Sequence, residues 1–271
     1  MGLPNYSFID GPGIRLRDQQ IIKNLTIEMR VPKTAVFGLF VSNVLIENCT
    51  FNSLSPINTY NTAIDIRSCR NVWIKNCTFN NWGASAIRSG ISAGLRENDT
   101  PFDSMGEGNT PTTNLIVTGC TFNNCYGPVI GFKHGGTQYA EIRQNKFNNF
   151  KIYGVSCEGE NGLTSNIQIT DNYIKGGANG NTWTYGIYVG ENAYKIEVAR
   201  NVIEYEGVRG GAICVSTSPS QGDTPVCDVN IYKNKGEVWV CPGDTNIYNL
   251  TCDVPYKLFY PDPKKTKGKV L

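Results

Sequence analysis

Acidic and basic side chains gather near the middle of the sequence, at Lys133, His134, Glu158, Glu160 and Glu191. Glycoside hydrolysis needs two carboxyl groups roughly 5 to 9.5 Å apart, one as the acid and one as the base or nucleophile. Glu158 could meet that separation with Glu191 or Glu160, and a neighbouring Lys133 would keep Glu158 ionised as the base. The candidate catalytic residues are therefore Glu158, Glu191, Lys133 and His134. Solvated charges that flank a turn are the alternative interpretation of this cluster.

Aromatic residues accompany these charges. Tyr153, Tyr185 and Tyr188 are expected on the same side of the molecule as the carboxylates, with Trp183 in the adjoining turn. Aromatic rings can stack on the faces of sugars, while carboxylates accept hydrogen bonds from sugar hydroxyls. The sequence thus predicts a sugar-binding groove. Its candidate substrate-binding residues are Arg88, Asp65, Tyr153, Glu160, Trp183, Tyr185 and Tyr188.

A segment of ten residues recurs seven times, and its repetition would bring the candidate residues together. The copies occupy residues 43–52, 71–80, 114–123, 139–148, 166–175, 195–204 and 228–237, so their starts lie 25 to 43 residues apart. A recurrence in this range indicates one structural unit stacked on itself. Residues in equivalent places of successive copies should then be neighbours, roughly 4.8 Å apart.

Each copy opens with apolar residues at alternate positions, such as Val44 and Ile46, or Ile167 and Ile169. This alternation is the pattern of a strand with one buried face. A second alternating stretch lies beside each copy, for example at 186–189, and Gly and Asn occur at most junctions. No stretch has the apolar periodicity of an amphipathic helix. The sequence therefore predicts a parallel β-solenoid with two or three short strands in each repeat.

Two columns of equivalent residues support the stacking. One column holds Cys in the first three copies and Asn in the last four: Cys49, Cys77, Cys120, Asn145, Asn172, Asn201 and Asn234. The other, two residues further on, is aromatic and then aliphatic: Phe51, Phe79, Phe122, Phe147, Ile174 and Ile203. Stacked amides can hydrogen-bond from coil to coil, and stacked rings can fill the interior.

Over about residues 10–250 the chain resembles the right-handed parallel β-helix family, the pectate-lyase-like group, whose turns carry such asparagine ladders and internal aromatic stacks. The resemblance implies an all-β fold, a right-handed single-stranded parallel β-helix of about eight coils. We expect an N-terminal segment at 1–20, the β-helix at 21–253 with an inserted loop at 91–113, and a non-repeating C-terminal tail at 254–271. The inserted loop is either an ordinary loop or one wall of a groove beside Asp65 and Arg88.

Composition argues against several classes of function. The net charge of +2 over 271 residues argues against a nucleic-acid-binding face, and no apolar run approaches the roughly 18 residues of a membrane span. No Cys and His spacing suggests zinc, and the carboxylates match no calcium-loop motif, so no metal or cofactor is expected. The ten cysteines are expected to be free buried thiols, with a bridge among Cys227, Cys241 and Cys252 left open.

Enzymes of the resembled family carry short motifs that this sequence lacks. Pectate lyases carry a Trp-Ile-Asp-His strand, whereas residues 72–76 read Val-Trp-Ile-Lys-Asn. Polygalacturonases carry an adjacent pair of aspartates and a Gly-His-Gly turn. The sequence has no such pair, and residues 133–136 read Lys-His-Gly-Gly. Neither activity can be assigned from the resemblance.

A β-helix without a secretion signal or a capping helix resembles the central part of a bacteriophage tailspike or tail-fibre protein. That resemblance implies a homotrimer that is made in the host cytoplasm and carried in the virion, with other tail or virion proteins as further partners. The leading interpretation is a receptor-binding domain for a bacterial surface polysaccharide, with hydrolysis of the bound chain left open. The alternatives are a non-enzymatic structural or adhesive β-helix of a virion or cell surface, and a secreted bacterial polysaccharide lyase or glycosidase.

Overall fold

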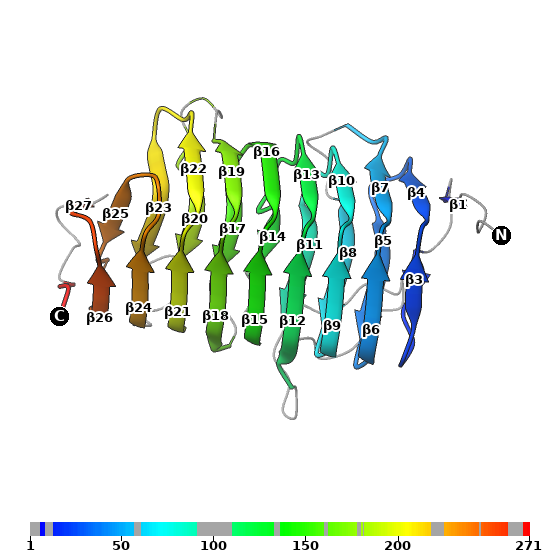
Figure 1. Ribbon diagram of the computed structural model, residues 1–271, viewed down its shortest axis with the longest axis horizontal. Coiled ribbons are helices and arrows are strands. Elements are labelled where there is room, and N and C mark those ends of the chain that lie inside the picture. Colours follow the sequence, from blue (N-terminus) through cyan, green and yellow to red (C-terminus); the bar gives the residue numbers. More distant parts are fainter. Residues whose placement is uncertain are drawn as a thin grey trace.

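The computed structural model describes residues 6–8, 13–56, 61–90, 110–132, 136–159, 162–177, 180, 182–217, 225–243, 245–259 and 268–271. All regular elements in these ranges are β-strands, β1 to β27, and no helix occurs among them. The strands form three parallel sheets, called sheets A, B and C below (Figure 1). None of the described residues belongs to a helix with the length and hydropathy that crossing a membrane requires.

Within the described ranges, the strands of each sheet follow one another along the axis of the β-helix. Sheet A has eight strands: β1 (Tyr6–Phe8), β4 (Thr26–Met29), β7 (Thr50–Ser53), β10 (Thr78–Asn80), β13 (Thr121–Asn123), β16 (Lys146–Phe150), β19 (Tyr173–Gly176) and β22 (Val202–Tyr205). Sheet B has ten: β2 (Ile14–Arg15), β5 (Thr34–Leu39), β8 (Thr62–Arg67), β11 (Ser85–Gly90), β14 (Ile130–Gly131), β17 (Tyr153–Cys157), β20 (Thr184–Val189), β23 (Gly210–Ser216), β25 (Val238–Cys241) and β27 (Tyr256–Leu258). Sheet C has nine: β26 (Ile247–Cys252), β24 (Val226–Tyr232), β21 (Ala193–Ala199), β18 (Thr164–Thr170), β15 (Thr137–Arg143), β12 (Thr112–Thr118), β9 (Arg70–Lys75), β6 (Ser42–Glu47) and β3 (Ile21–Lys23).

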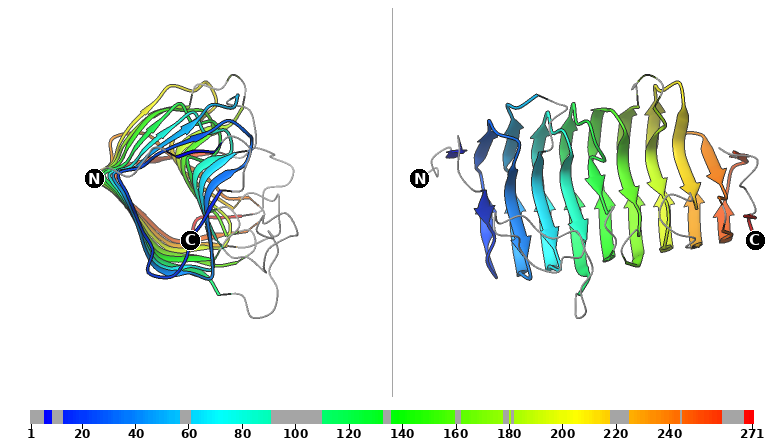
Figure 2. Two further views of the ribbon diagram at one scale, coloured as in Figure 1. Left: turned by 90° about the vertical axis from the view of Figure 1, so that its right-hand side faces the viewer. Right: turned by 180° about the vertical axis from the view of Figure 1, so that it is seen from behind.

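Successive strands belong to different sheets, so the chain winds in coils. A typical coil runs from sheet C through sheet A to sheet B, as in β6, β7 and β8, and each strand pairs in parallel with its equivalents one coil away. Seen along the axis, the three sheets form the sides of an elongated prism around the core (Figure 2). The architecture is the right-handed parallel β-helix that the sequence predicts. Partial coils at both ends bring the described strands to slightly more than the expected eight coils.

Parallel pairing starts before residue 21 and continues past residue 253. β1 pairs with β4, and β2 pairs with β5, within the segment expected to precede the solenoid. At the other end β27 pairs with β25 in sheet B, and Val270 forms a bridge with Ile247. The described parts of both terminal segments therefore join the sheets of the β-helix.

In most coils one residue with a left-handed backbone turns the chain out of sheet C. Its φ lies between 51° and 65°, at Asn24, Asn48, Asn76, Gly119, Gln144, Asp171, Arg200 and Lys233. Asn and Gly tolerate this conformation best, and at Gly119 an added Cβ would also collide with Oδ1 of Asn76. Arg200 and Lys233 show that stacked coils can impose the turn on residues that do not favour it.

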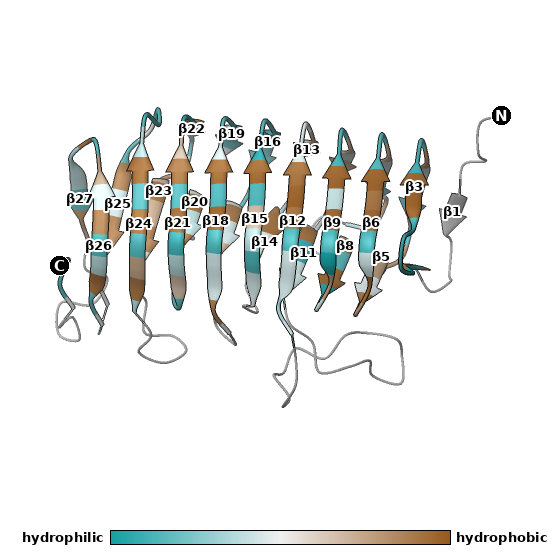
Figure 3. Ribbon diagram, turned by 60° about the horizontal axis from the view of Figure 1, so that its bottom comes forward, coloured by the Kyte–Doolittle hydropathy of each residue, from teal (hydrophilic) through white to brown (hydrophobic). Residues whose placement is uncertain are grey.

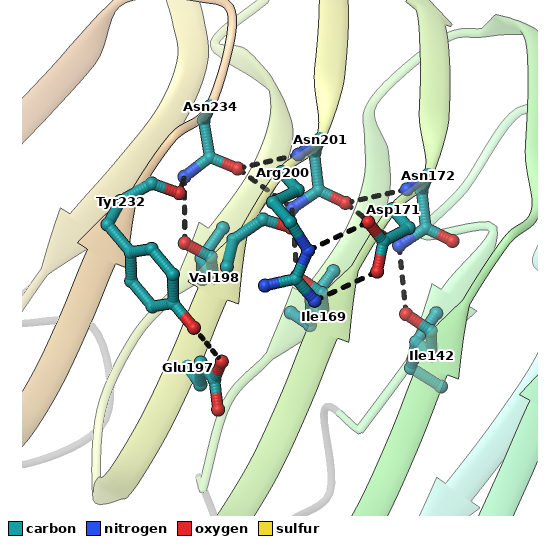
Figure 4. A network of polar contacts seen from close by, with 11 residues as sticks. Ile142, Ile169, Asp171, Asn172, Glu197, Val198, Arg200, Asn201, Tyr232 and Asn234 are labelled. Atoms are coloured by element: carbon teal, nitrogen blue, oxygen red, sulfur yellow. Dashed lines mark hydrogen bonds and ion pairs between the residues drawn. The ribbon is translucent and has the colours of Figure 1, made fainter.

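Asparagine side chains directly after this turn form a buried ladder (Figure 4). Each Nδ2 donates to the next Oδ1, over 3.0, 2.9 and 2.9 Å along the series Asn145, Asn172, Asn201 and Asn234. The same Oδ1 atoms accept from backbone N–H groups, as from Asn145 to Asn172 over 3.0 Å. The first three residues of the series are at most 2% exposed. The ladder therefore supplies hydrogen-bond partners to polar groups that the core shields from water.

The aromatic column, two residues further on, lies behind sheet A. Ring centroids are 4.9, 4.9 and 4.7 Å apart along the series Phe51, Phe79, Phe122 and Phe147. The column continues with Ile174 and Ile203, as the sequence predicts, and all six side chains are buried. Because the ring separation matches the spacing of strands, the stacked rings and the paired backbones share one register.

The ten cysteines are free thiols, and eight of them are buried. In the first coils they occupy the ladder position, where each Sγ donates to a carbonyl oxygen, as from Cys77 to Lys75 over 3.2 Å. Burial raises the pKa of the Cys125 thiol to about 12. The buried thiols therefore behave as small core side chains of low reactivity. No disulfide joins the less regular group Cys227, Cys241 and Cys252.

Replacement of Asn172 by alanine should destabilise the β-helix strongly. The change removes the acceptor of the Asn145 backbone N–H and the donor to the Ile142 carbonyl oxygen, both inside the core. Since each buried polar group left unpaired costs about 1–3 kcal/mol, we expect the free energy of unfolding to fall by about 2 to 6 kcal/mol in urea denaturation. Asn52→Ala is the control, because Asn52 ends a partly exposed ladder and only accepts from Asn80 over 2.7 Å. Equal losses in the two variants would contradict the role of the inner ladder.

Candidate functional site

The candidate residues that the structure describes lie on or next to strands of sheet B, which stack in register. The inward column consists of Ile64, Ile87, Ile130, Val155, Ile187 and Ile213. The next residue of each strand forms the outer column of Asp65, Arg88, Gly131, Ser156, Tyr188 and Cys214. Because side chains alternate along a strand, the outer column faces away from the core.

The outer face of sheet B is largely buried as well. Every residue of β8, β20 and β23 is buried, whereas β9 of sheet C has accessible residues between its buried ones. Glu158 and Glu191 are only 7% and 3% exposed. Either carboxylate is therefore open only to a ligand group that packs directly on sheet B.

Three stacked tyrosines form a platform on this face. Tyr153 and Tyr185 pair between β17 and β20, and their ring centroids are 6.0 Å apart. The ring of Tyr188 lies 5.2 Å from the first ring and 5.7 Å from the second, and the three planes agree within 23°. Tyr185 and Tyr188 are buried, while Tyr153 is partly exposed. The accessible edge of the tyrosine platform is therefore Tyr153.

Glu158 and Glu191 come from adjacent coils, one residue after β17 and two residues after β20. The backbone N–H of Gly159 donates to the carbonyl oxygen of Glu191 over 2.6 Å, which holds the two segments side by side. The hydroxyl of Ser156 donates to Oε1 of Glu158 and orients its carboxylate. The structure thus places the backbone segments of the two selected glutamates side by side.

Burial and negative charge raise the pKa values of the platform tyrosines. For Tyr153 and Tyr188 burial is the largest cause, and the charges of Glu158 and Glu191 add to it. Burial is also the largest cause for Tyr185. Both carboxylates therefore lie within electrostatic reach of the rings. At neutral pH the phenols stay protonated and can donate hydrogen bonds.

Asp65 and Arg88 lie several coils away from the platform, on β8 and β11. Asp65 forms a buried ion pair with Arg67, whose Nε is 2.5 Å from Oδ1 and whose Nη2 is 3.3 Å from Oδ2. Asp65 is 4% exposed and Arg67 is fully buried, whereas Arg88 is partly exposed. The ion pair accounts for the burial of Asp65, so we interpret Asp65 as a structural partner of Arg67. Of these two residues, Arg88 is the one whose side chain a ligand can reach.

Trp183 lies beside the tyrosine platform and contacts the C-terminal segment. Its ring centroid is 4.6 Å from that of Phe259, and Phe259 lies 5.8 Å from Trp239. Trp183 and Tyr153 are the partly buried residues that pack on the cluster of Tyr185 and Tyr188. The predicted aromatic group is therefore contiguous in the folded chain.

Two members of this site are missing from the sequence prediction. Ser156 lies two residues before Glu158, and strand alternation places both side chains on one face, which is the signal that would identify it. Phe259 has no such signal, because it lies outside the repeat and no alignment of copies assigns it to a coil.

Lys133, His134 and Glu160 lie outside the described residues, as do residues 91–109 of the inserted loop. Their roles in catalysis and binding stay predictions. Among the residues that the structure does describe, no group of three or more His, Cys, Asp or Glu side chains could hold a metal ion.

A family model for the right-handed β-helix region matches residues 12–203. The chain therefore belongs to the right-handed β-helix family, and its architecture is the pectate-lyase-like one that the repeat predicts. No curated protein matches the sequence.

Solved structures share this fold at low sequence identity. The exopolygalacturonase of Thermotoga maritima is 13% identical, with a TM-score of 0.57 over 92% of this chain and 72% of that chain. PfbA, a surface adhesin of Streptococcus pneumoniae, is 11% identical, with a TM-score of 0.55 over 95% and 81%. A tailspike protein mutant of E. coli bacteriophage HK620, in complex with a pentasaccharide, is 12% identical, with a TM-score of 0.43 over 99% and 57%. The first two similarities show the fold alone, and the third is too distant to support an argument.

The raised pKa values predict that Tyr153, Tyr185 and Tyr188 resist ionisation until the protein unfolds. A tyrosine whose pKa is higher in the folded state stabilises the fold below the unfolded value of about 10, and this contribution is lost as the pH rises above it. An ultraviolet absorbance titration should therefore show tyrosines that ionise only with alkaline unfolding. A variant with phenylalanine at all three positions should no longer show the tyrosines that ionise only on unfolding. Ionisation of every tyrosine near its ordinary pKa in folded protein would contradict the burial of the platform.

Proposed function

We propose that this protein binds a bacterial surface polysaccharide on the outer face of sheet B and cleaves it by hydrolysis. The observation that supports this is the pair Glu158 and Glu191, held in adjacent coils beside three parallel tyrosine rings. Sugars present C–H faces that pack on aromatic rings and hydroxyls that hydrogen-bond to carboxylates and phenols. One site therefore offers both kinds of contact that a sugar requires.

The two carboxyl groups divide the proton transfers of hydrolysis between them. Their backbones are about one strand spacing apart, ~4.8 Å, which is compatible with the carboxyl separation of roughly 6.5 to 9.5 Å that leaves room for an attacking water. Glu158, oriented by Ser156, is the base that accepts a proton from the attacking water. Glu191 is the acid that protonates the glycosidic oxygen as its bond to the sugar breaks. Because both groups are buried, a bound sugar chain excludes bulk water from the reacting atoms.

The remaining contacts come from the accessible residues around the platform. Tyr153 and Trp183 are partly exposed and provide ring faces for sugar stacking. Arg88, further along the same sheet, provides a cation for polar or acidic substituents of the chain. In this proposal Lys133 and His134 support catalysis and Glu160 contacts substrate, as the sequence predicts.

Replacement of either carboxyl group should abolish cleavage without unfolding the protein. Glu158→Gln and Glu191→Gln keep the shape of the side chain but remove its proton transfer, so hydrolysis should fall by about 100- to 10,000-fold. The measurement follows new reducing ends from capsular, lipopolysaccharide and plant polysaccharides, together with the ultraviolet absorbance of unsaturated products. Glu28→Gln, on β4 of sheet A, is the matched control and should retain full activity.

Three outcomes of this experiment are informative. Reducing ends that disappear in both variants and persist in Glu28→Gln would support hydrolysis at this site. Unsaturated products would indicate a lyase and contradict the proposed roles of acid and base. Cleavage that survives both replacements would place the chemistry elsewhere.

A second candidate is an adhesive β-helix that binds the polysaccharide without cleaving it. The low exposure of Glu158 and Glu191, 7% and 3%, favours this candidate, because the carboxylates could serve only to hold the tyrosine platform. The adhesin PfbA also shares the fold almost as closely as the exopolygalacturonase does, with TM-scores of 0.55 and 0.57. Binding that Tyr153→Ala weakens, without products from any polysaccharide, would favour adhesion.

The proposed setting is a bacteriophage tailspike or tail fibre, in which three copies assemble and act outside the host cell. Light scattering on the purified protein should then give three times the mass of one chain. A secreted polysaccharide lyase or glycosidase of this fold would instead be expected as a monomer, and a stable monomer at working concentration would contradict the tailspike setting.

A further inference from the structure

The outer face of sheet C carries a groove that takes no part in the site on sheet B. It has a volume of ≈ 580 Å³ and crosses five neighbouring strands, β9, β12, β15, β18 and β21. We propose that this groove binds a neutral glycan chain along the axis of the β-helix. The proposal does not depend on cleavage at sheet B and shares only the class of ligand with the proposed function.

The groove follows a kink that every coil repeats at the same place. In the five strands the kinked residues have a left-handed backbone, with φ of 55° to 57°, at Asn71, Asn114, Tyr139, Asn166 and Lys195. Strand pairing skips this position, for example between β12 and β15. Apolar and polar bands recur at similar levels along the strands of sheet C (Figure 3). Since the kinks are in register, the concave surface continues from coil to coil.

Each coil contributes the kinked residue and the outward residue two positions later. The later residues stack in one column, which runs along the axis as Trp73, Ile116, Glu141, Gln168 and Glu197. One end of this column is therefore apolar, and the other end carries amide and carboxylate groups. An extended ligand would contact both ends at once.

The apolar end offers surfaces for the C–H faces of sugars. Trp73 and Ile116 are partly exposed, and Tyr139 is 58% exposed although it lies within the groove. Accessible rings on a fixed sheet bind flat ligands without an entropic loss from flexible side chains. This end can therefore stack sugar rings.

Amide groups supply the directional contacts. Asn114 donates to Asn71 over 2.9 Å, and within the described part of the chain no donor reaches its own Oδ1. Gln168 donates through Nε2 to Glu197 over 3.2 Å, which leaves Oε1 able to accept. Planar amides in fixed positions match the paired donors and acceptors of neighbouring sugar hydroxyls.

The charges of the groove nearly cancel, which identifies the class of glycan. Glu141 accepts from Arg143 over 3.0 Å, Glu197 accepts from Tyr232, and Lys195 lines the same end (Figure 4 shows Glu197). An acidic chain would be repelled by the two carboxylates, and a basic one by Lys195 and Arg143. A neutral hexose chain meets neither penalty.

Two substitutions copied from other coils of the same sheet test the groove. Trp73→Gln introduces the residue that Gln168 supplies to the same column, and Tyr139→Asn introduces the residue that Asn166 supplies at the kink. Both therefore suit the local backbone. Tyr248→Ala is the control, because Tyr248 is 38% exposed on β26 of the same sheet but does not line the groove. Calorimetric titration of the whole chain would use neutral gluco-, manno- and galacto-oligosaccharides, with acidic oligosaccharides for comparison.

The expected result is binding of a neutral oligosaccharide that weakens at least tenfold in the double variant Trp73→Gln/Tyr139→Asn and stays unchanged in Tyr248→Ala. Circular dichroism of the variants would show that the fold is kept. Equal affinity in the double variant and the control would overturn the proposal. Binding of acidic chains alone, or of no oligosaccharide, would overturn it as well. Self-association that the double variant abolishes would instead make this face a contact between copies.

The site on sheet B is tested separately in the same experiment. Tyr153→Ala should leave binding at the groove unchanged, because Tyr153 lies on a different sheet. Loss of all glycan binding in Tyr153→Ala, with none lost in the double variant, would reject the groove and keep the proposed function. Loss only in the double variant would support the groove, whether or not Glu158 and Glu191 cleave the polysaccharide.

Discussion

Parallel backbone pairing between successive coils is the interaction on which the rest of this molecule depends. It places equivalent residues of neighbouring coils about 4.8 Å apart, so each side chain has its own equivalent as its nearest neighbour. Phenylalanine rings can stack at that distance, and the observed centroids are 4.7 to 4.9 Å apart. Asparagine amides can hydrogen-bond at that distance as well. The interior is therefore composed of columns, each with one chemical character along several coils.

The asparagine column also protects the register of the coils. Asn172 and Asn201 satisfy each other and nearby backbone groups while almost wholly buried. A slip of one residue in one coil would turn its amide away from the ladder and leave polar groups unpaired in the core. The first coils place Cys at this position instead, and a small thiol imposes a weaker penalty on a slip. The ladder thus favours one register of the coils, whereas the aromatic column alone would contribute only packing.

The same stacking produces two outer faces with different properties. Sheet C alternates buried and accessible residues, so its outer side chains form a regular array that a long ligand can follow. Sheet B buries most of its outer residues too, and there charges act through a medium of low dielectric constant. The raised tyrosine pKa values are a consequence of that burial, and the ion pair with Arg67 compensates for the burial of Asp65. Fixed, shielded groups suit proton transfer, whereas an open array suits extended recognition.

The sequence by itself determined the β-helix, the inner columns and the face that carries Glu158, Glu191 and the three tyrosines. These depend on alternation along a strand and on the period of the repeat, and both can be read by aligning copies. The burial of that face, the hydrogen bond from Ser156 and the pairing of Asp65 with Arg67 were decided only by the tertiary structure. The groove on sheet C was also decided only by the tertiary structure. Burial, the choice of side-chain partner and concavity depend on side-chain conformations and on neighbouring coils, which come together only when the chain is folded.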